Sequence, residues 1–180
     1  MPLSNKNSIA DRLQALAEEG RSSTRVLSQQ RAPADYDQLS QQLAVLISGE
    51  KDRVANLANC AALLRQGMPA INWVGFYLLK RNTLVLGPFQ GKPACTRIEI
   101  GRGVCGLAAE IFKTVIIGNV HEFPGHIACD LNSRSEIVLP IIIDGKFIGL
   151  LDINSPEVDR FDHVDQQGLE GIIQILIAQI

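Results

Sequence analysis

Apolar residues recur at helical spacing in two stretches of the first half of the chain. The first stripe consists of Leu39, Leu43, Leu46 and Ile47, and the second consists of Val54, Leu57, Ala58, Ala61 and Leu64. Gly67 and Pro69 then interrupt the helical pattern. The sequence therefore predicts two consecutive amphipathic helices that end before residue 69.

From Asn72 onward the pattern is that of β-strands. The runs NWVGFYLLK and LVLGPF, separated by the turn RNT, predict two strands, and a short third strand is expected between Ala94 and Ile98. LAAEIFK predicts a short helix and TVIIGNV a buried strand. EIVLPIII and KFIGLLDINS, joined by Asp-Gly, are typical of a hairpin. A final helix is expected from Asp162, with an apolar face of Val164, Leu169, Ile172, Ile173 and Leu176.

Strands joined mainly by hairpins, with helices at both ends, indicate an antiparallel sheet backed by helices. We therefore predict an α+β domain over residues 36–180. Residues 1–35 are expected to form an N-terminal extension: a short amphipathic helix carrying Ile9, Leu13, Leu16 and Ala17, followed by a polar linker over residues 21–35.

Composition narrows the class of protein. The 180 residues are 46% hydrophobic and 20% charged, which is ordinary for a globular domain, and the net charge of −2 argues against a nucleic-acid partner. The N-terminus lacks the apolar core of a secretory signal, and no apolar run approaches the roughly 20 residues that span a bilayer. We expect a cytoplasmic protein, in which a disulfide would be a turnover intermediate because thiols are kept reduced there.

Four cysteines divide into two kinds of setting. Cys60 lies in the apolar helical run LANCAALL, where a thiol is usually inert. Cys95, Cys105 and Cys129 lie instead in loop-like stretches within 35 residues of one another. Cys105, in GRGVCG, is expected at a helix start, where free N–H groups and the helix dipole would stabilise a thiolate. His126 precedes Cys129 closely, so this region is a candidate thiol centre.

Two other interpretations of these cysteines remain open. In the first interpretation, the three cysteines are ordinary small loop residues, since free cysteines are usually structural. In the second, His121, His126 and Cys129 join Cys105 or Cys95 in a zinc site. The chain lacks the CxxC pair that usually marks a structural zinc site.

Two further sets of residues share strand faces. Trp73 and Tyr77 lie four positions apart on one strand, with Gly75 between them, so a hollow flanked by two rings is expected. On the strand pattern alone, the simpler interpretation is that both rings fill the core. Asp152 and Asn154 share one face of a later strand, and Glu136 opens its neighbour. Such carboxyls near a sheet end would bind an ammonium group or keep a proton and act as an acid.

The runs NWVGFYLL, LVLGPFQGKPACTRI, GRGVCG, HIACD, SRSEIVLP and GLLDINS resemble the free methionine-(R)-sulfoxide reductases, which are single GAF domains. The resemblance covers residues 36 to 178. It implies a six-stranded antiparallel sheet with packed helices, a homodimer, and reduction of free methionine-(R)-sulfoxide to methionine. It also implies no metal or organic cofactor, with thioredoxin as the external reductant.

The same resemblance implies roles for individual residues. Cys129 would be the nucleophile, although Cys105 has that role in some relatives, and Cys95 would form the intramolecular disulfide after a sulfenic acid intermediate. Trp73 and Tyr77 would surround the substrate methyl group. Glu136 and Asp152 would be carboxylates of the pocket, protonating the leaving oxygen and facing the substrate ammonium.

The chain departs from its relatives at two positions of the expected substrate-binding set. Asn154 and Asn119 stand where relatives commonly have aspartate, which removes two potential negative charges. Asparagine can accept a hydrogen bond but cannot donate a proton as an acid. An alternative function is therefore a non-catalytic GAF module that binds a small molecule or senses redox state.

Overall fold

The computed structural model describes residues 34–124 and 130–180. Six antiparallel strands form one sheet in the order β3-β2-β1-β6-β5-β4, which confirms the predicted fold class. The strands are β1 (Trp73–Lys80), β2 (Thr83–Gln90), β3 (Arg97–Glu99), β4 (Val115–Ile117), β5 (Ser135–Ile143) and β6 (Lys146–Ser155). The helices are α2 (Tyr36–Leu46), α3 (Arg53–Gly67), α4 (Gly103–Ile111) and α5 (His163–Ile177), with a 3-10 turn η1 (Val120–Glu122).

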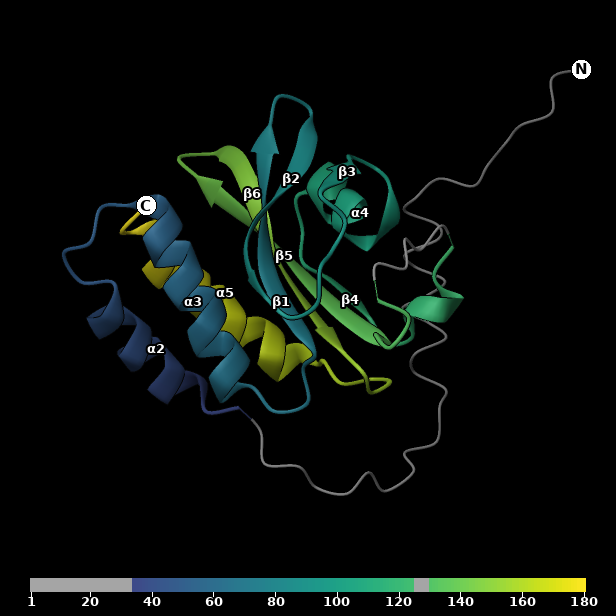
Figure 1. The fold of residues 1–180 in the computed structure, drawn as a ribbon, viewed down its shortest axis with the longest axis horizontal. Helices are drawn as coiled ribbons and strands as arrows, with labels where there is room; N and C mark the ends of the chain where they lie inside the picture. Colours follow the sequence, from purple (N-terminus) through teal and green to yellow (C-terminus); the bar gives the residue numbers. More distant parts are fainter. Residues whose placement is uncertain (1–33, 125–129) are drawn as a thin grey trace, which may run out of the picture. The chain divides into compact units, whose positions relative to one another are not determined.

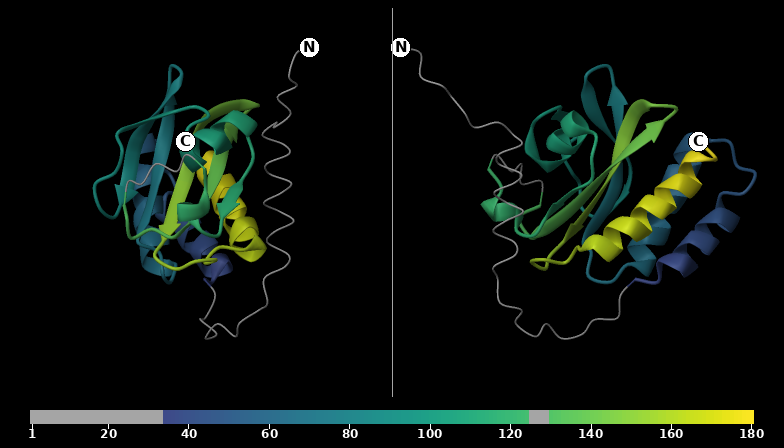
Figure 2. Two further views of the ribbon diagram at one scale, coloured as in Figure 1. Left: turned by 90° about the vertical axis from the view of Figure 1, so that its right-hand side faces the viewer. Right: turned by 180° about the vertical axis from the view of Figure 1, so that it is seen from behind.

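Helices α2, α3 and α5 cover one face of the sheet, whereas α4 lies on the opposite face beside β3 (Figures 1 and 2). The main core fills the space between the three helices and the sheet. Its fully buried side chains include Leu43, Leu57, Phe76, Leu151 and Leu169. The helices from both ends of the domain therefore stabilise one face, and the other face is left to α4 and the loops.

An aspartate begins each of the three packed helices. Asp35, Asp52 and Asp162 accept hydrogen bonds from backbone N–H groups of the first turns of α2, α3 and α5. At α5, Asp165 closes a capping box and also accepts from Arg160 at 2.9 and 3.0 Å and from the Tyr36 hydroxyl at 2.6 Å. The hydrogen bond between Tyr36 and Asp165 therefore connects α2 to α5.

The β5–β6 hairpin forms as predicted. Its Asp144-Gly145 turn has φ values of 49° and 73°, and two consecutive positive φ angles suit an Asp-Gly pair. The turn places Glu136 opposite Asn154 and Ile137 opposite Ile153. Because side chains alternate along strands, Ile137 and Ile153 face the helical core while Glu136 and Asn154 face α4.

Several local predictions differ from the structure. The short helix expected from Leu107 begins at Gly103, four residues earlier. Leu46, Val54 and Val164 belong to the predicted apolar faces but are 47%, 60% and 59% exposed. The predicted helix and linker before residue 34 lie outside the described residues. None of the helices among the described residues combines the length and the hydropathy that a bilayer span requires.

Candidate active site

The register of three central strands builds one polar patch on the α4 side of the sheet. Asn154 of β6 pairs with Trp73 of β1 on one side and with Glu136 of β5 on the other. Asp152 lies two residues earlier on the same face of β6, opposite Gly75. The strand pairing thus gathers residues that are up to 81 positions apart in sequence into two adjacent rows.

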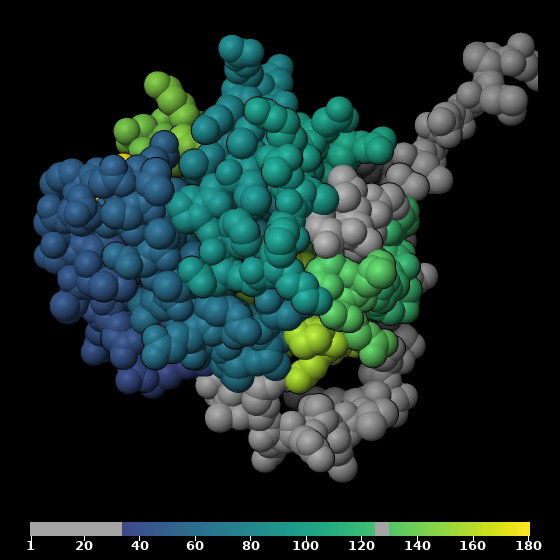
Figure 3. Space-filling model, in the orientation of Figure 1, coloured from purple at the N-terminus to yellow at the C-terminus, as the bar shows by residue number. Residues whose placement is uncertain are grey.

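These rows form the floor of a cavity of about 50 Å³, which has room for only a few water molecules or a small ligand group. Residues from β1, α4, β5 and β6 line it, among them Trp73, Tyr77, Cys105, Glu136, Asp152 and Asn154. In the space-filling view, teal atoms of the middle of the chain occupy the centre of the face shown (Figure 3). Lys92, Pro93, Ala94 and Arg102, from the chain between β2 and α4, also line the cavity.

Two stacked aromatic rings, Trp73 and Tyr77, line one wall of the cavity, and Phe89 stacks against Trp73. The Trp73 ring lies 5.5 Å from Phe89 and 6.1 Å from Tyr77, with interplanar angles of 17° and 29°. A Cβ atom at Gly75 would lie 2.5 Å from the Trp73 ring. It would also lie 2.4 Å from Phe89 Cβ, so the hollow predicted over Gly75 is filled by its aromatic neighbours and leaves no room for a side chain at this position.

The polar groups of Trp73 and Tyr77 both hydrogen-bond to the segment that follows β2. The Trp73 Nε1–H donates to the Lys92 carbonyl at 3.0 Å, and the Tyr77 hydroxyl donates to the Cys95 carbonyl at 2.9 Å. The Lys92 ammonium in turn pairs with Asp130 at 3.2 Å. Cys95 is thus held on a segment that is fastened to the cavity wall and to Asp130.

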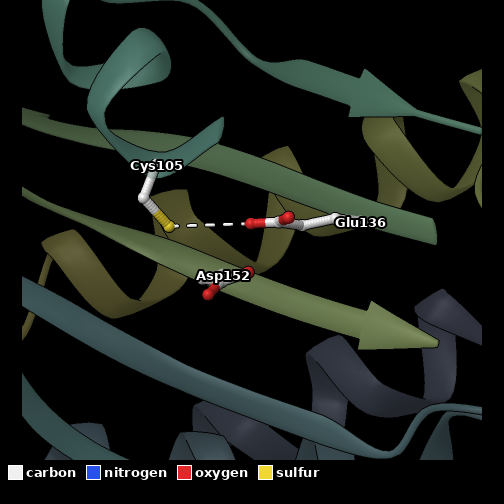
Figure 4. A group of neighbouring side chains, drawn as sticks. All are labelled: Cys105, Glu136 and Asp152. Atoms are coloured by element: carbon white, nitrogen blue, oxygen red, sulfur yellow. Dashed lines mark hydrogen bonds between the residues drawn. The ribbon is translucent and has the colours of Figure 1, made fainter. Parts of the chain in front are cut away.

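Cys105 enters the cavity from the opposite side, from the first turn of α4. A Cβ atom at Gly106 would lie 2.5 Å from the Glu99 carbonyl, so glycine allows α4 to approach the end of β3 closely. The Cys105 sulfur points down at the sheet and lies 3.7 Å from Glu136 Oε1 (Figure 4). That sulfur and one oxygen from each of Glu136 and Asp152 all lie within 4.8 Å of one another.

Burial of the two carboxyls changes their acidity. Glu136 and Asp152 are 5% and 6% exposed. Burial, followed by the charge of Asp152, raises the pKa of Glu136 well above its usual range. Burial also raises the pKa of Asp152, to about 7, although hydrogen bonds from its neighbours oppose the rise. Since two buried like charges at this distance repel, the pair retains a proton at neutral pH.

The prediction of a stabilised thiolate at Cys105 is wrong. Burial and the nearby Asp152 and Glu136 carboxyls raise the pKa of this thiol well above its usual range. The α4 N-terminus is present as predicted, but burial of the sulfur and the two acidic groups facing it outweigh the helix dipole. Cys105 is therefore a neutral S–H group. Cys60, the predicted inert thiol, is fully buried, and burial raises its pKa to about 12.

The thiol and carboxyl cluster also bears on the zinc hypothesis. In the absence of a metal, burial and mutual repulsion raise the pKa values of Cys105, Glu136 and Asp152. We therefore interpret them as a proton-holding cluster. Within the described residues, the group of neighbouring ligand atoms contains neither His121 nor Cys95, and His126 and Cys129 lie outside the described residues.

The remaining predicted site residues have different positions. Asn119 caps η1, where it accepts from the His121 N–H at 3.2 Å, and it does not line the described cavity. Two features escaped the sequence interpretation: the Lys92–Asp130 pair, and the hydrogen bond from Asn154 to Asp152 at 2.8 Å. The first joins residues 38 positions apart without a local signal, whereas the i, i+2 spacing of the second was visible in the sequence.

The chain is similar to known proteins over most of its length. The GAF domain model matches residues 35–180. A free methionine-R-sulfoxide reductase of Escherichia coli is 51% identical over 138 residues, which are 77% of this chain and 84% of that protein. The structure of fRMsr of Staphylococcus aureus in its reduced form superposes with a TM-score of 0.81 at 51% identity, covering 84% of this chain and 99% of that one.

A second solved structure includes a ligand. The free methionine-R-sulfoxide reductase from Neisseria meningitidis in complex with its substrate superposes with a TM-score of 0.78 at 42% identity, covering 86% of this chain and 95% of that one. Both similarities cover more than four fifths of this chain.

Proposed function

This chain belongs to the GAF domain family and is closely related to free methionine-R-sulfoxide reductases, and on that basis we propose that it reduces free methionine-(R)-sulfoxide to methionine. The observation that carries the proposal is a buried carboxyl pair that retains a proton beside an aromatic wall. Sulfoxide reduction needs a proton for the departing oxygen, and such a pair supplies one.

The proposed substrate position follows from the lining of the cavity. The methyl group and sulfur lie against Trp73 and Tyr77, because an aromatic face favours contact with soft, apolar groups. The sulfoxide oxygen faces the carboxyl pair. The ammonium group lies near an ionised carboxylate, for which a charge-assisted hydrogen bond is stronger than a neutral one.

In the first proposed step, the Cys129 thiolate attacks the sulfoxide sulfur. One carboxyl of the pair gives its proton to the oxygen, the sulfur–oxygen bond breaks, and the oxygen is transferred to the cysteine. Methionine leaves, and Cys129 becomes a sulfenic acid. The neutral, buried Cys105 thiol supports this assignment, since a protonated thiol is a poor nucleophile. Cys129 lies outside the described residues, so its role rests on the family resemblance.

The proposed cycle then returns the enzyme to its starting state. The Cys95 thiol condenses with the sulfenic acid, releasing water and forming a disulfide with Cys129. A thioredoxin-like dithiol reduces this disulfide by thiol exchange and is itself oxidised. We propose a cytoplasmic setting, where thiols are kept reduced, and assembly as a homodimer, which size-exclusion chromatography with light scattering would test.

One experiment tests the function itself. The reduced full chain is mixed with a small excess of free methionine-(R)-sulfoxide and dithiothreitol, with the (S) epimer as a matched control, and methionine is measured. We expect methionine from the (R) epimer only, and none with Cys129→Ser. Tight binding of the (R) epimer without turnover would refute the enzyme and favour a binding module. Turnover that survives Cys129→Ser but not Cys105→Ser would transfer the nucleophile to Cys105.

A further inference from the structure

Asn154 lies on the same strand as Asp152 and opposite Glu136 on the neighbouring strand, but its side chain bonds to Asp152. It is the cross-strand partner of Glu136, while its side-chain Nδ2 donates to Asp152 Oδ1 at 2.8 Å. An amide N–H can only donate, so this bond stabilises the ionised form of Asp152. Glu136 instead faces the Cys105 thiol at 3.7 Å, which is a weak donor.

Two other groups also lower the pKa of Asp152, namely Glu136, through the hydrogen bond between the two carboxyls, and Cys105. Cys105, from α4, bonds to both carboxyls, and the bond between the carboxyls can carry its proton on either side, so of these three contacts only the Asn154 bond is made to Asp152 alone. Tyr77, from β1, already donates its hydroxyl to the Cys95 carbonyl. Lys92, at the rim, pairs with Asp130. Arg102, the residue before α4, also lines the cavity.

We propose that Asn154 is a positioning residue that fixes the shared proton on Glu136 and makes Asp152 the carboxyl that ionises first. The inference rests on the proposed function for its chemical meaning, because it assigns the general acid to Glu136 and the ammonium contact to Asp152. It also reinterprets the departure from aspartate at this position. A third carboxyl here would add charge to the pair, whereas the amide separates its two members into an acid and an anion.

The test follows the two carboxyls directly, without substrate. Side-chain carboxyl carbons of the reduced full chain are labelled with ¹³C and titrated by NMR, with Glu136→Gln and Asp152→Asn assigning the signals. We expect the step at lower pH to appear mainly on Asp152 and the step at higher pH on Glu136. A lower step carried by Glu136, or shared equally by both carboxyls, would overturn the inference.

Removing the donor gives a second readout. Asn154→Leu has nearly the same shape but no N–H, so the lower step should rise by roughly one pH unit, the size expected for a hydrogen bond to a charged group. The upper step should stay, because Asp152 is ionised both before and after it. A role in folding alone would leave both steps unmoved, and that result would overturn the inference. Asn154→Ala, which also lacks a side-chain donor, serves as the second variant if Asn154→Leu does not fold.

Two comparisons separate this inference from a general effect of added charge and from the proposed function. Asn82→Asp, an exposed change in the β1–β2 turn, adds a charge remote from the cavity and should leave both steps in place. If the NMR steps behave as expected but methionine is not formed, the proposed function fails and the proton assignment stands. If methionine is formed but the steps do not respond to Asn154→Leu, only the assignment fails.

Discussion

Asp152→Asn should stabilise the protein while it harms the site. Folding buries the Asp152 carboxyl and raises its pKa from 3.8 to about 7. Between these pH values the unfolded chain gives up a proton that the folded chain keeps, so the unfolded state gains stability as pH rises. The penalty is absent below pH 4, grows up to about pH 7 and is complete above it.

The rise of the Asp152 pKa from 3.8 to about 7 lowers the unfolding free energy of the wild type by about 4 kcal/mol once the pH is above 7. Asparagine has almost the same shape as aspartate, and its carbonyl oxygen can still accept the hydrogen bond from Asn154. The variant should therefore be more stable than the wild type by up to about 4 kcal/mol at pH 8 and nearly equal to it at pH 4.

Urea denaturation of the reduced protein at pH 4 and pH 8 measures this difference. Asp144→Asn in the exposed β5–β6 turn is the matched control, since the same atoms change without burial, and it should show no gain that depends on pH. An equal gain at both pH values for Asp152→Asn would assign the effect to packing. No gain at pH 8 would refute the argument that burial raises this pKa.

Three more variants test other parts of the description. Cys105→Ala should keep methionine formation within about tenfold of wild type in a steady-state assay, because it removes only a weak hydrogen bond; loss of turnover would contradict a non-nucleophilic role. Gly75→Ala should displace the Trp73 ring and cost about 1–3 kcal/mol in thermal unfolding, and an unchanged melting temperature would disprove the close approach. Asp165→Ala should cost about 3–5 kcal/mol in urea, since it leaves the buried Arg160 charge unpaired.

Much of the fold was predictable because its signals are local. Strand alternation and the Asp144-Gly145 turn set the β5–β6 pairing, and the same alternation places Glu136, Asp152 and Asn154 on one face. The cross-strand neighbours in the cavity floor follow from that register.

The chemistry of Cys105 was not predictable in this way. A thiol at a helix start suggests a thiolate. The reversal comes from burial of the sulfur and then from carboxyls on two strands, the nearer of them 31 positions along the chain. Likewise, Gly75 suggested an open hollow because strand alternation does not reveal the conformation of the Trp73 side chain. Both errors concern tertiary neighbours, which local patterns do not identify.

The chain contains a single tryptophan, and it is the ring that forms the wall of the cavity. Trp73 is 5% exposed, stacked between Phe89 and Tyr77, and bonded through its N–H to the segment that carries Cys95. All indole fluorescence of this protein therefore originates at the cavity wall. Its emission is an intrinsic optical signal for ligand occupancy and for rearrangement of that segment, without any added label.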